Sequence, residues 1–176
     1  LGLGQKLSMA VAKNYFKLLA YKDEYEVARL YTDGRFVEQL QQQFEGNFSV
    51  KFNLAPPLFA KKDAKGHLVK AEFGSWMWRA FKLLAKAKGL RGGSFDIFGY
   101  TNERKMERAL IVEYRELLAG LLANLTAENL ATCVELASLP EKIRGFGHVK
   151  EAAVDTYRKD KARLLAVLAD GSKHAA

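Results

Sequence analysis

The residues best suited to holding an anion surround a pair of glycines near the middle of the chain. Arg91-Gly92-Gly93-Ser94 has the composition of a backbone nest, in which successive N–H groups converge on one negative charge. Arg104 lies beyond the nest and would add a second guanidinium group to that of Arg91. The alternative is structural, because glycines permit positive φ angles and the following apolar residues would then fill the space between two helices. Those residues are Phe95, Ile97 and Phe98.

A second candidate anion site precedes the last expected helix. Arg144 and Lys150 flank Gly145-Phe-Gly147, and the Gly147 amide would lie at a helix start, where backbone N–H groups attract negative charge. A plain helix–helix turn explains the same residues. The sequence leaves both interpretations open.

The third candidate is a row of cations on one expected helix, formed by Arg79, Lys82 and Lys86. The surrounding region Lys61–Lys105 holds eleven basic and four acidic side chains, so +7 of the chain's net charge of +8 lies there. Such clustering predicts an anionic partner, whether nucleic acid, a phosphate-bearing ligand or an acidic protein surface. A charged face that only keeps the protein soluble is the alternative.

Nucleic acid is the less favoured of these partners. Binding to single strands needs exposed rings on which bases stack. The helical pattern places the aromatic residues of this region mainly at buried positions: Trp76, Trp78 and Phe81.

No set of catalytic or metal-binding residues emerges from the sequence. The three histidines, His67, His148 and His174, have no second His or Cys at the helical spacing of zinc ligands. The single cysteine, Cys133, cannot ligate an iron–sulfur cluster alone and is expected to be a buried core thiol. We therefore predict no catalytic, cofactor-binding or metal-binding residue in this chain.

Apolar residues at helical spacing dominate the elements that would position these side chains. They predict a mainly α, compact domain of about six to seven helices. Four residues are expected to cap helices: Asp23 with Glu26 three residues later, Ser75, Thr101 and Thr126. The expected helices cover residues 7–21, 23–32, 36–44, 75–89, 101–123, 126–140 and 149 onward.

The periodicity changes around residues 47–73, where we predict a small antiparallel β insert. Apolar residues alternate with polar ones over 48–54, which is typical of a half-buried strand. A second hairpin is expected from 58–61 to 67–73, through a turn at 63–66.

Length and composition set further expectations for the chain. It has 176 residues and no apolar run near the ~18 residues of a membrane span, so no membrane partner is expected. The lone cysteine favours a reducing, cytoplasmic location. The first residue is Leu1 and no signal peptide is recognisable, so we expect 1–176 to be a single helical domain excised from a larger multidomain chain. The apolar patch Leu164–Leu168 needs a partner inside or outside the chain.

Five strings carry a family resemblance that covers roughly residues 7–157: Asp23–Phe36, Leu54–Leu58, Phe73–Met77, Asp96–Arg104 and Leu139–Ala153. These strings resemble segments of the C-terminal region of large fused indolepyruvate ferredoxin oxidoreductases, and they occur in the same order there. These enzymes are members of the 2-oxoacid:ferredoxin oxidoreductase superfamily.

The resemblance implies a parent enzyme that oxidatively decarboxylates aryl 2-oxoacids to acyl-CoA. Such a parent uses thiamine diphosphate with magnesium and iron–sulfur clusters, and passes electrons to ferredoxin. The motifs for these groups are absent here, so no catalytic residue is carried over to this sequence. The chain is then expected to be a non-catalytic accessory domain of a homo-oligomeric parent. It would dock on the catalytic domains or on the second protomer, and its basic face would assist CoA or ferredoxin binding. The alternative, from the residues alone, is a nucleic-acid-binding helical module that uses the Lys61–Lys105 region.

Overall fold

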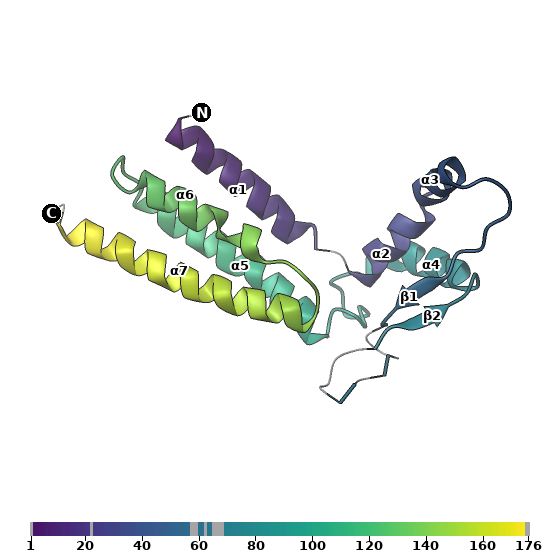
Figure 1. Cartoon of the computed structure of the whole chain (residues 1–176). Coiled ribbons are helices and arrows are strands. Elements are labelled where there is room, and N and C mark those ends of the chain that lie inside the picture. The colour runs from purple at the N-terminus through teal and green to yellow at the C-terminus, as the bar shows by residue number, and fades with distance from the viewer. Residues whose placement is uncertain (1, 22, 57–59, 62, 65–68, 175–176) are drawn as a thin grey trace. The chain divides into compact units, whose positions relative to one another are not determined.

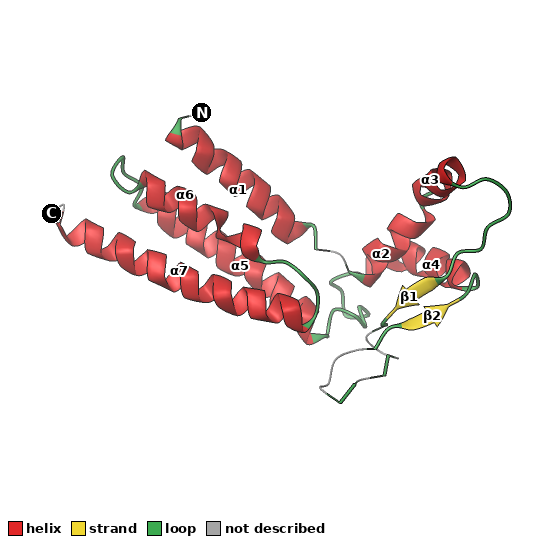
Figure 2. Cartoon of the chain, viewed as in Figure 1, coloured by secondary structure: helices red, strands yellow, loops and turns green. Residues whose placement is uncertain are grey.

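The computed structural model describes residues 2–21, 23–56, 60–61, 63–64 and 69–174, with side chains up to residue 170. Within these ranges the protein has seven α-helices and one two-stranded antiparallel sheet, which confirms the predicted fold class (Figures 1 and 2). The chain divides into two compact units. Unit 1 comprises Leu1–Tyr21 and Met106–Ala176, and unit 2 comprises Lys22–Lys105. That residues 1–176 act as one domain stays a prediction.

Unit 1 is a bundle of four α-helices around one apolar core. It contains α1 (Leu3–Leu19), most of α5 (Asn102–Ala123), α6 (Leu130–Ser138) and α7 (His148–His174), with the 3-10 helix η2 (Leu139–Lys142) after α6. Every helix contributes buried side chains to the core, among them Leu7, Leu18, Leu110, Tyr114, Cys133, Leu136, Val154 and Tyr157. The Tyr114 hydroxyl donates to the Ala137 carbonyl at 2.8 Å, which satisfies a polar group inside this core.

The helix starts agree with the capping predictions in part. Thr101 precedes α5, and its Oγ1 accepts from the Arg104 N–H at 3.4 Å, as expected for an N-cap. The prediction that Thr126 caps the next helix is wrong, because α6 begins at Leu130. Instead, Thr126 and Asn129 each accept from the other's backbone N–H, at 3.3 and 2.9 Å. Such local side chain–backbone bonds compete with helix formation and delay the helix by one turn.

The apolar patch Leu164–Leu168 is only partly covered within unit 1. Leu164 is buried in the core, and Leu168 packs against it partly buried. Leu165 and Val167 point outward and are exposed. The helical period therefore divides one apolar run in the sequence between two faces of α7.

Unit 2 is built around a cluster of aromatic rings. Its elements are α2 (Glu24–Thr32), α3 (Arg35–Gln43), β1 (Phe52–Leu54), β2 (Ala71–Phe73), α4 (Met77–Lys86) and the 3-10 helix η1 (Ala87–Leu90). Helices α2 and α4 pack against each other. The Tyr31 ring of α2 stacks on Phe81 of α4 with centroids 5.2 Å apart, and meets Phe52 edge-on at 5.2 Å. This cluster holds α4 against α2 and the sheet.

The β insert exists, but its pairing differs from the prediction. β1 pairs antiparallel with β2, so that Phe52 faces Phe73 and Leu54 faces Ala71. The expected strand over 48–54 shortens to Phe52–Leu54, because only three residues of β2 pair with it. Residues 71–73 thus pair with β1. One contact of the predicted hairpin is present, because the Val69 N–H donates to the Lys61 carbonyl at 2.7 Å. The parts of the predicted hairpin at 58–59, 62 and 65–68, including His67, lie outside the described residues.

No α-helix in the described ranges combines the length and the apolar character that crossing a membrane requires.

Candidate functional site

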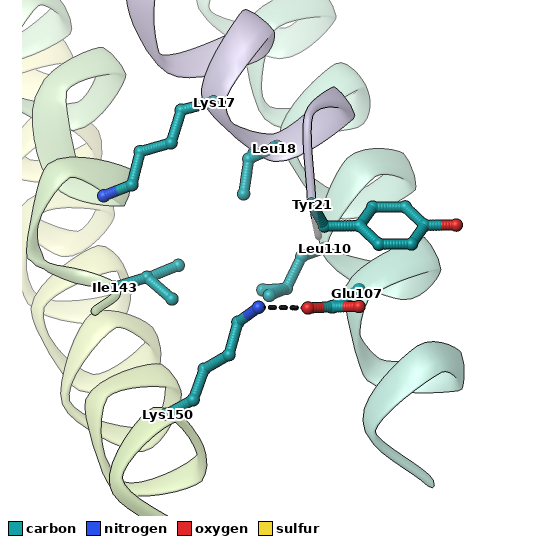
Figure 3. A pocket seen from close by; sticks show the side chains of 7 residues that line it. All are labelled: Lys17, Leu18, Tyr21, Glu107, Leu110, Ile143 and Lys150. Atoms are coloured by element: carbon teal, nitrogen blue, oxygen red, sulfur yellow. Dashed lines mark hydrogen bonds and ion pairs between the residues drawn. The ribbon is translucent and has the colours of Figure 1, made fainter. Parts of the chain in front are cut away.

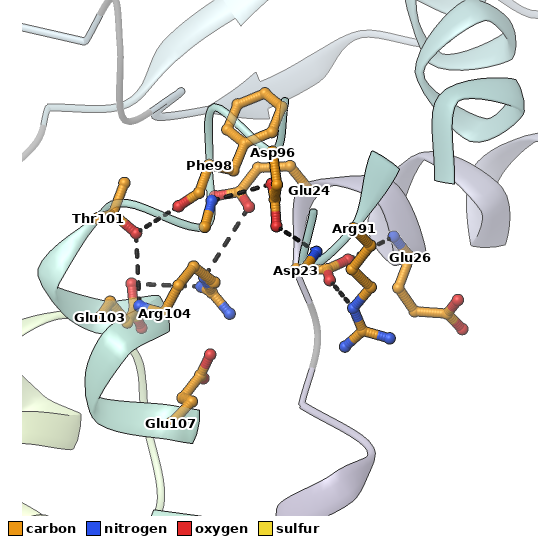
Figure 4. Close-up of polar contacts among 12 residues, drawn as sticks. Asp23, Glu24, Glu26, Arg91, Asp96, Phe98, Thr101, Glu103, Arg104 and Glu107 are labelled. Atoms are coloured by element: carbon orange, nitrogen blue, oxygen red, sulfur yellow. Dashed lines mark hydrogen bonds and ion pairs between the residues drawn. The ribbon is translucent and has the colours of Figure 1, made fainter. Parts of the chain in front are cut away.

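One amide of the predicted glycine nest, that of Gly92, binds a carboxylate of the chain itself. Asp96 is buried, and its Oδ2 accepts from the Gly92 N–H at 2.8 Å (Figure 4). Its Oδ1 accepts from the Gly99 N–H at 2.9 Å. Gly92 has a positive φ of +75°, which the structural alternative expected of both glycines, whereas Gly93 does not have one. Gly93 instead donates its N–H to the Leu90 carbonyl at 2.9 Å. The Gly92 amide therefore already binds an anion, and that anion is internal.

Gly99 is required by the close approach of this carboxylate. A Cβ at Gly99 would lie 2.4 Å from Asp96 Oδ2, far inside van der Waals contact. Our reading of the sequence missed Asp96 as the centre of the segment. The available signal was Asp96-Ile-Phe-Gly99, an acid three residues before a glycine, which is typical of a turn closed by the Asp side chain.

The nest is tied to the start of α2 by a second set of polar contacts. Asp23 caps α2, with Oδ1 accepting from the Glu26 N–H at 2.8 Å, as predicted. The other oxygen, Oδ2, forms an ion pair with the Arg91 guanidinium. Burial, the nearby Asp96 charge and a hydrogen bond to Asp96 together raise the pKa of the Tyr25 hydroxyl. Two carboxylates thus join two segments of unit 2 that are about seventy residues apart in the sequence.

Arg104 also faces carboxylates of unit 2 rather than solvent. It is buried, with Nε 3.9 Å from Glu24 Oε2 and Nη2 3.5 Å from Glu103 Oε2. Burial raises the pKa of Glu24, and the positive charge of Arg104 opposes that rise. Arg91 and Arg104, predicted as ligands of an external anion, are both placed beside acids of the chain.

The apolar residues of this segment do not fill an interior space, contrary to the structural alternative. Phe95 is 79% exposed, and Ile97 is also exposed. Phe98 alone of the three packs inward, with its ring edge-on to Tyr25 at 5.4 Å. The segment is a series of tight turns between η1 and α5, so neighbouring side chains point in different directions.

The second candidate anion site lies in unit 1, beside a small pocket of about 60 Å³ (Figure 3). Lys150 forms an ion pair with Glu107, and both side chains are largely buried. Arg144 Nε donates to the Glu141 carbonyl at 3.2 Å. Gly147 has a positive φ of +54° before α7. The pocket is lined by Lys17, Leu18, Tyr21, Glu107, Leu110, Ile143 and Lys150.

Lys17 belongs to this site, and sequence reasoning missed it. Its Nζ donates to the carbonyls of Pro140 and Glu141 at 2.8 and 3.0 Å. Burial lowers the pKa of Lys17, and so do the nearby charges of Arg144 and Lys150. More than 120 residues separate Lys17 from these carbonyls, so no local pattern could have indicated the contact. Lys17 thus joins α1 to η2, and Lys150 joins α7 to α5.

The predicted basic row on α4 is present and exposed. Arg79, Lys82 and Lys86 all point away from unit 2's core. Trp76 is 60% exposed, so the expectation that it is buried is wrong, whereas Trp78 is half-buried and Phe81 buried as expected. Ser75 is not the N-cap, because α4 begins at Met77 and the preceding residue is Trp76. The Trp76 ring therefore lies at the surface, next to the cations.

The similarity of this chain to a known family extends over most of its length and is not confined to one site. Residues 2–163 match the model of DUF6537, described as a family of unknown function. The chain belongs to this family. The match takes in elements of both units, from α1 to the middle of α7. No match was found among curated proteins or among solved structures.

This DUF6537 chain shows no metal-ligand cluster in the part that the structure describes. No three side chains of the types His, Cys, Asp and Glu come together there as a metal site would require. Cys133 is fully buried on α6, and burial raises the pKa of its thiol. Both properties are those of an unreactive core cysteine.

The Cys133 thiol should therefore resist modification in native DUF6537 protein. Burial excludes the reagent, and the raised pKa lowers the fraction of reactive thiolate. We expect labelling by Ellman's reagent at pH 8 to be at least about 100-fold slower in buffer than in 8 M urea, because it needs local opening of the bundle. Equal rates in the two solutions would show that α6 does not shield the thiol.

Proposed function

We propose that the chain is a non-catalytic helical module of an indolepyruvate-type 2-oxoacid:ferredoxin oxidoreductase. Its role is to dock on the catalytic domains or the second protomer of the parent, and its basic face assists binding of CoA or ferredoxin. The five strings of residues described above support the assignment. The thiamine diphosphate, magnesium and iron–sulfur clusters belong to the parent in this proposal. One cysteine and the absence of a metal-ligand cluster in the described residues do not fit a site for them here.

The observation that carries the docking role is an apolar stripe on the outer face of α1. Met9, Ala12, Phe16 and Leu19 recur at i, i+3, i+7 and i+10 and are all exposed, with Phe16 71% exposed. Leu7 and Leu18, on the opposite face, lie in the core of unit 1. A helix that is apolar on both faces is typical of one that packs against a second partner.

Deletion of this module from the parent tests the proposal. If the module docks, removing residues 1–176 should reduce the parent's assembly, its turnover, or both. Light scattering after size exclusion would measure the assembly, and reduction of ferredoxin by the 2-oxoacid would measure turnover. A truncated parent with unchanged mass and rate would refute the proposal.

A point variant separates docking from folding in the same parent. Phe16→Ser removes the most exposed ring of the stripe, and we expect association of the module to weaken about tenfold, because aromatic anchors dominate interface energies. Lys6→Ser, also on α1 and exposed, is the matched control and should bind as the unaltered chain does. Equal loss in both variants would point to damage of α1 instead of loss of an interface.

A further inference from the structure

Helix α4 presents a mixed apolar and cationic surface that unit 2 leaves uncovered. Trp76, Arg79, Leu83 and Lys86 follow at i, i+3, i+7 and i+10 and so lie on one face, with Lys82 beside them. Leu83 is 72% exposed, and Trp76 is exposed nearly as much. The other face of α4 is buried in the core of unit 2. We call these five residues the α4 stripe.

The α4 stripe is positively charged, and no acidic residue lies within its segment of the sequence. The sequence from Ser75 to Arg91 contains five basic residues and no Asp or Glu. Arg91 pairs with Asp23, as described above. In contrast, Arg79, Lys82 and Lys86 make no ion pair with any other residue that the structure describes. The α4 stripe thus combines three exposed cations with two large exposed apolar side chains. A partner of opposite charge would complement the cations.

The α4 stripe is also held in place from beneath. Phe81 stacks on Tyr31, and Met77 is buried beside it in the same core. The stripe residues extend from a helix fixed on its inner face, so little backbone ordering is needed when a partner binds. Such preorganisation favours a specific interface over a merely solvated face.

We propose that the α4 stripe docks an acidic protein surface that has an apolar patch at its centre. The cations would guide the approach of the partner, and Leu83 and Trp76 would supply the desolvated contact. The inference rests on the proposed function, in which ferredoxin is an acidic protein partner. It adds which face of this chain meets that partner, and that the contact is apolar as well as electrostatic.

Two other classes of partner fit these residues less well. Nucleic acid would bind the cations through its phosphates and could stack one base on Trp76. A phosphate backbone has no apolar group to pack on the exposed aliphatic side chain of Leu83. A lipid surface requires a continuous apolar face on one side of a helix, and that face of α4 is buried in unit 2 through Met77 and Phe81.

Binding of a purified ferredoxin to the 176-residue chain tests the inference, measured by biolayer interferometry at 50 and 300 mM NaCl. The first variant reverses the three cations together: Arg79→Glu, Lys82→Glu and Lys86→Glu. The matched control reverses three exposed cations of unit 1 and changes the net charge equally: Lys6→Glu, Arg115→Glu and Lys159→Glu. We expect the α4 variant to bind at least tenfold more weakly at 50 mM NaCl, and the control less than threefold more weakly.

The neutral variant Leu83→Ser tests the apolar contact on its own. We expect it to weaken ferredoxin binding about fivefold at both salt concentrations, because the lost contact is not electrostatic. Circular dichroism checks that each variant keeps its helices. Equal binding by the α4 variant and the unit 1 control, an unchanged Leu83→Ser variant, or no binding by the unaltered chain would each overturn the inference.

Two further probes reveal the competing partners. A fluorescein-labelled dT20 oligonucleotide and vesicles of phosphatidylglycerol and phosphatidylcholine replace ferredoxin in the same comparison. If either binds more tightly than ferredoxin and loses binding in the α4 variant, the stripe serves that partner and the inference is wrong. The deletion experiment on the parent is read separately. An unaffected truncated parent refutes the proposed function, whereas ferredoxin binding that depends on the stripe would still stand.

Discussion

Replacing Asp96 with alanine should lower the free energy of unfolding of unit 2 by about 3 kcal/mol or more. The carboxylate accepts backbone N–H groups from Gly92 and Gly99 at 2.8 and 2.9 Å while buried. A hydrogen bond to a charged group contributes about 1.5–3 kcal/mol, and a buried donor left unpaired costs further. Both contacts end in the alanine variant. Urea denaturation followed by tryptophan fluorescence would measure the loss, since both tryptophans, Trp76 and Trp78, lie in unit 2.

The control for Asp96→Ala is a conservative change at the same position. Asp96→Asn keeps one acceptor oxygen and the side-chain volume, so we expect it to lose about half as much stability as the alanine variant. If the alanine variant unfolds at the same urea concentration as the unaltered chain, the carboxylate does not close the turn. The segment would then be free to hold an external anion.

Replacing Phe81 with alanine should lower the stability of unit 2 by about 3–5 kcal/mol, the usual cost of removing a buried ring. Phe81 stacks on Tyr31 and meets Phe52 edge-on, with centroids 5.2 Å apart in both pairs. Its loss opens a cavity between α2, α4 and β1. The same urea titration would measure the effect.

Leu83→Ala on the same helix is the matched control for Phe81→Ala. Its side chain is mostly exposed, so we expect a change within about 0.5 kcal/mol. The pair therefore tests which face of α4 is internal. Comparable losses in the two variants would contradict the orientation on which the α4 stripe depends.

The helices were accessible from sequence because their causes are local. Asp23 and Glu26 have the spacing of a capping box, and the Asp23 side chain does accept the Glu26 N–H. Thr101 likewise caps α5. Thr126 shows the limit of such reasoning, since the same residue type can bond within a turn and postpone the helix.

The sheet was only partly accessible for a different reason. Alternation over 48–54 indicates a strand, and β1 does form within that range. Which segment pairs with it depends on contacts between residues about twenty positions apart. The prediction paired 67–73 with the nearer segment 58–61, whereas Ala71–Phe73 form β2 and pair with β1. Periodicity specifies a face of a strand and leaves its partner open.

The sequence by itself determined that this is a mainly helical, basic chain whose positive charge concentrates in Lys61–Lys105. Composition and local periodicity fix these properties, because each depends on residues within a few turns of one another. Tertiary structure decided which cations are available to a partner. Arg91 and Lys150 pair with Asp23 and Glu107, while Arg79, Lys82 and Lys86 remain exposed. A cation is neutralised when the fold brings an acidic side chain within about 4 Å of it. When the two residues are far apart in the sequence, their spacing does not indicate whether they come that close.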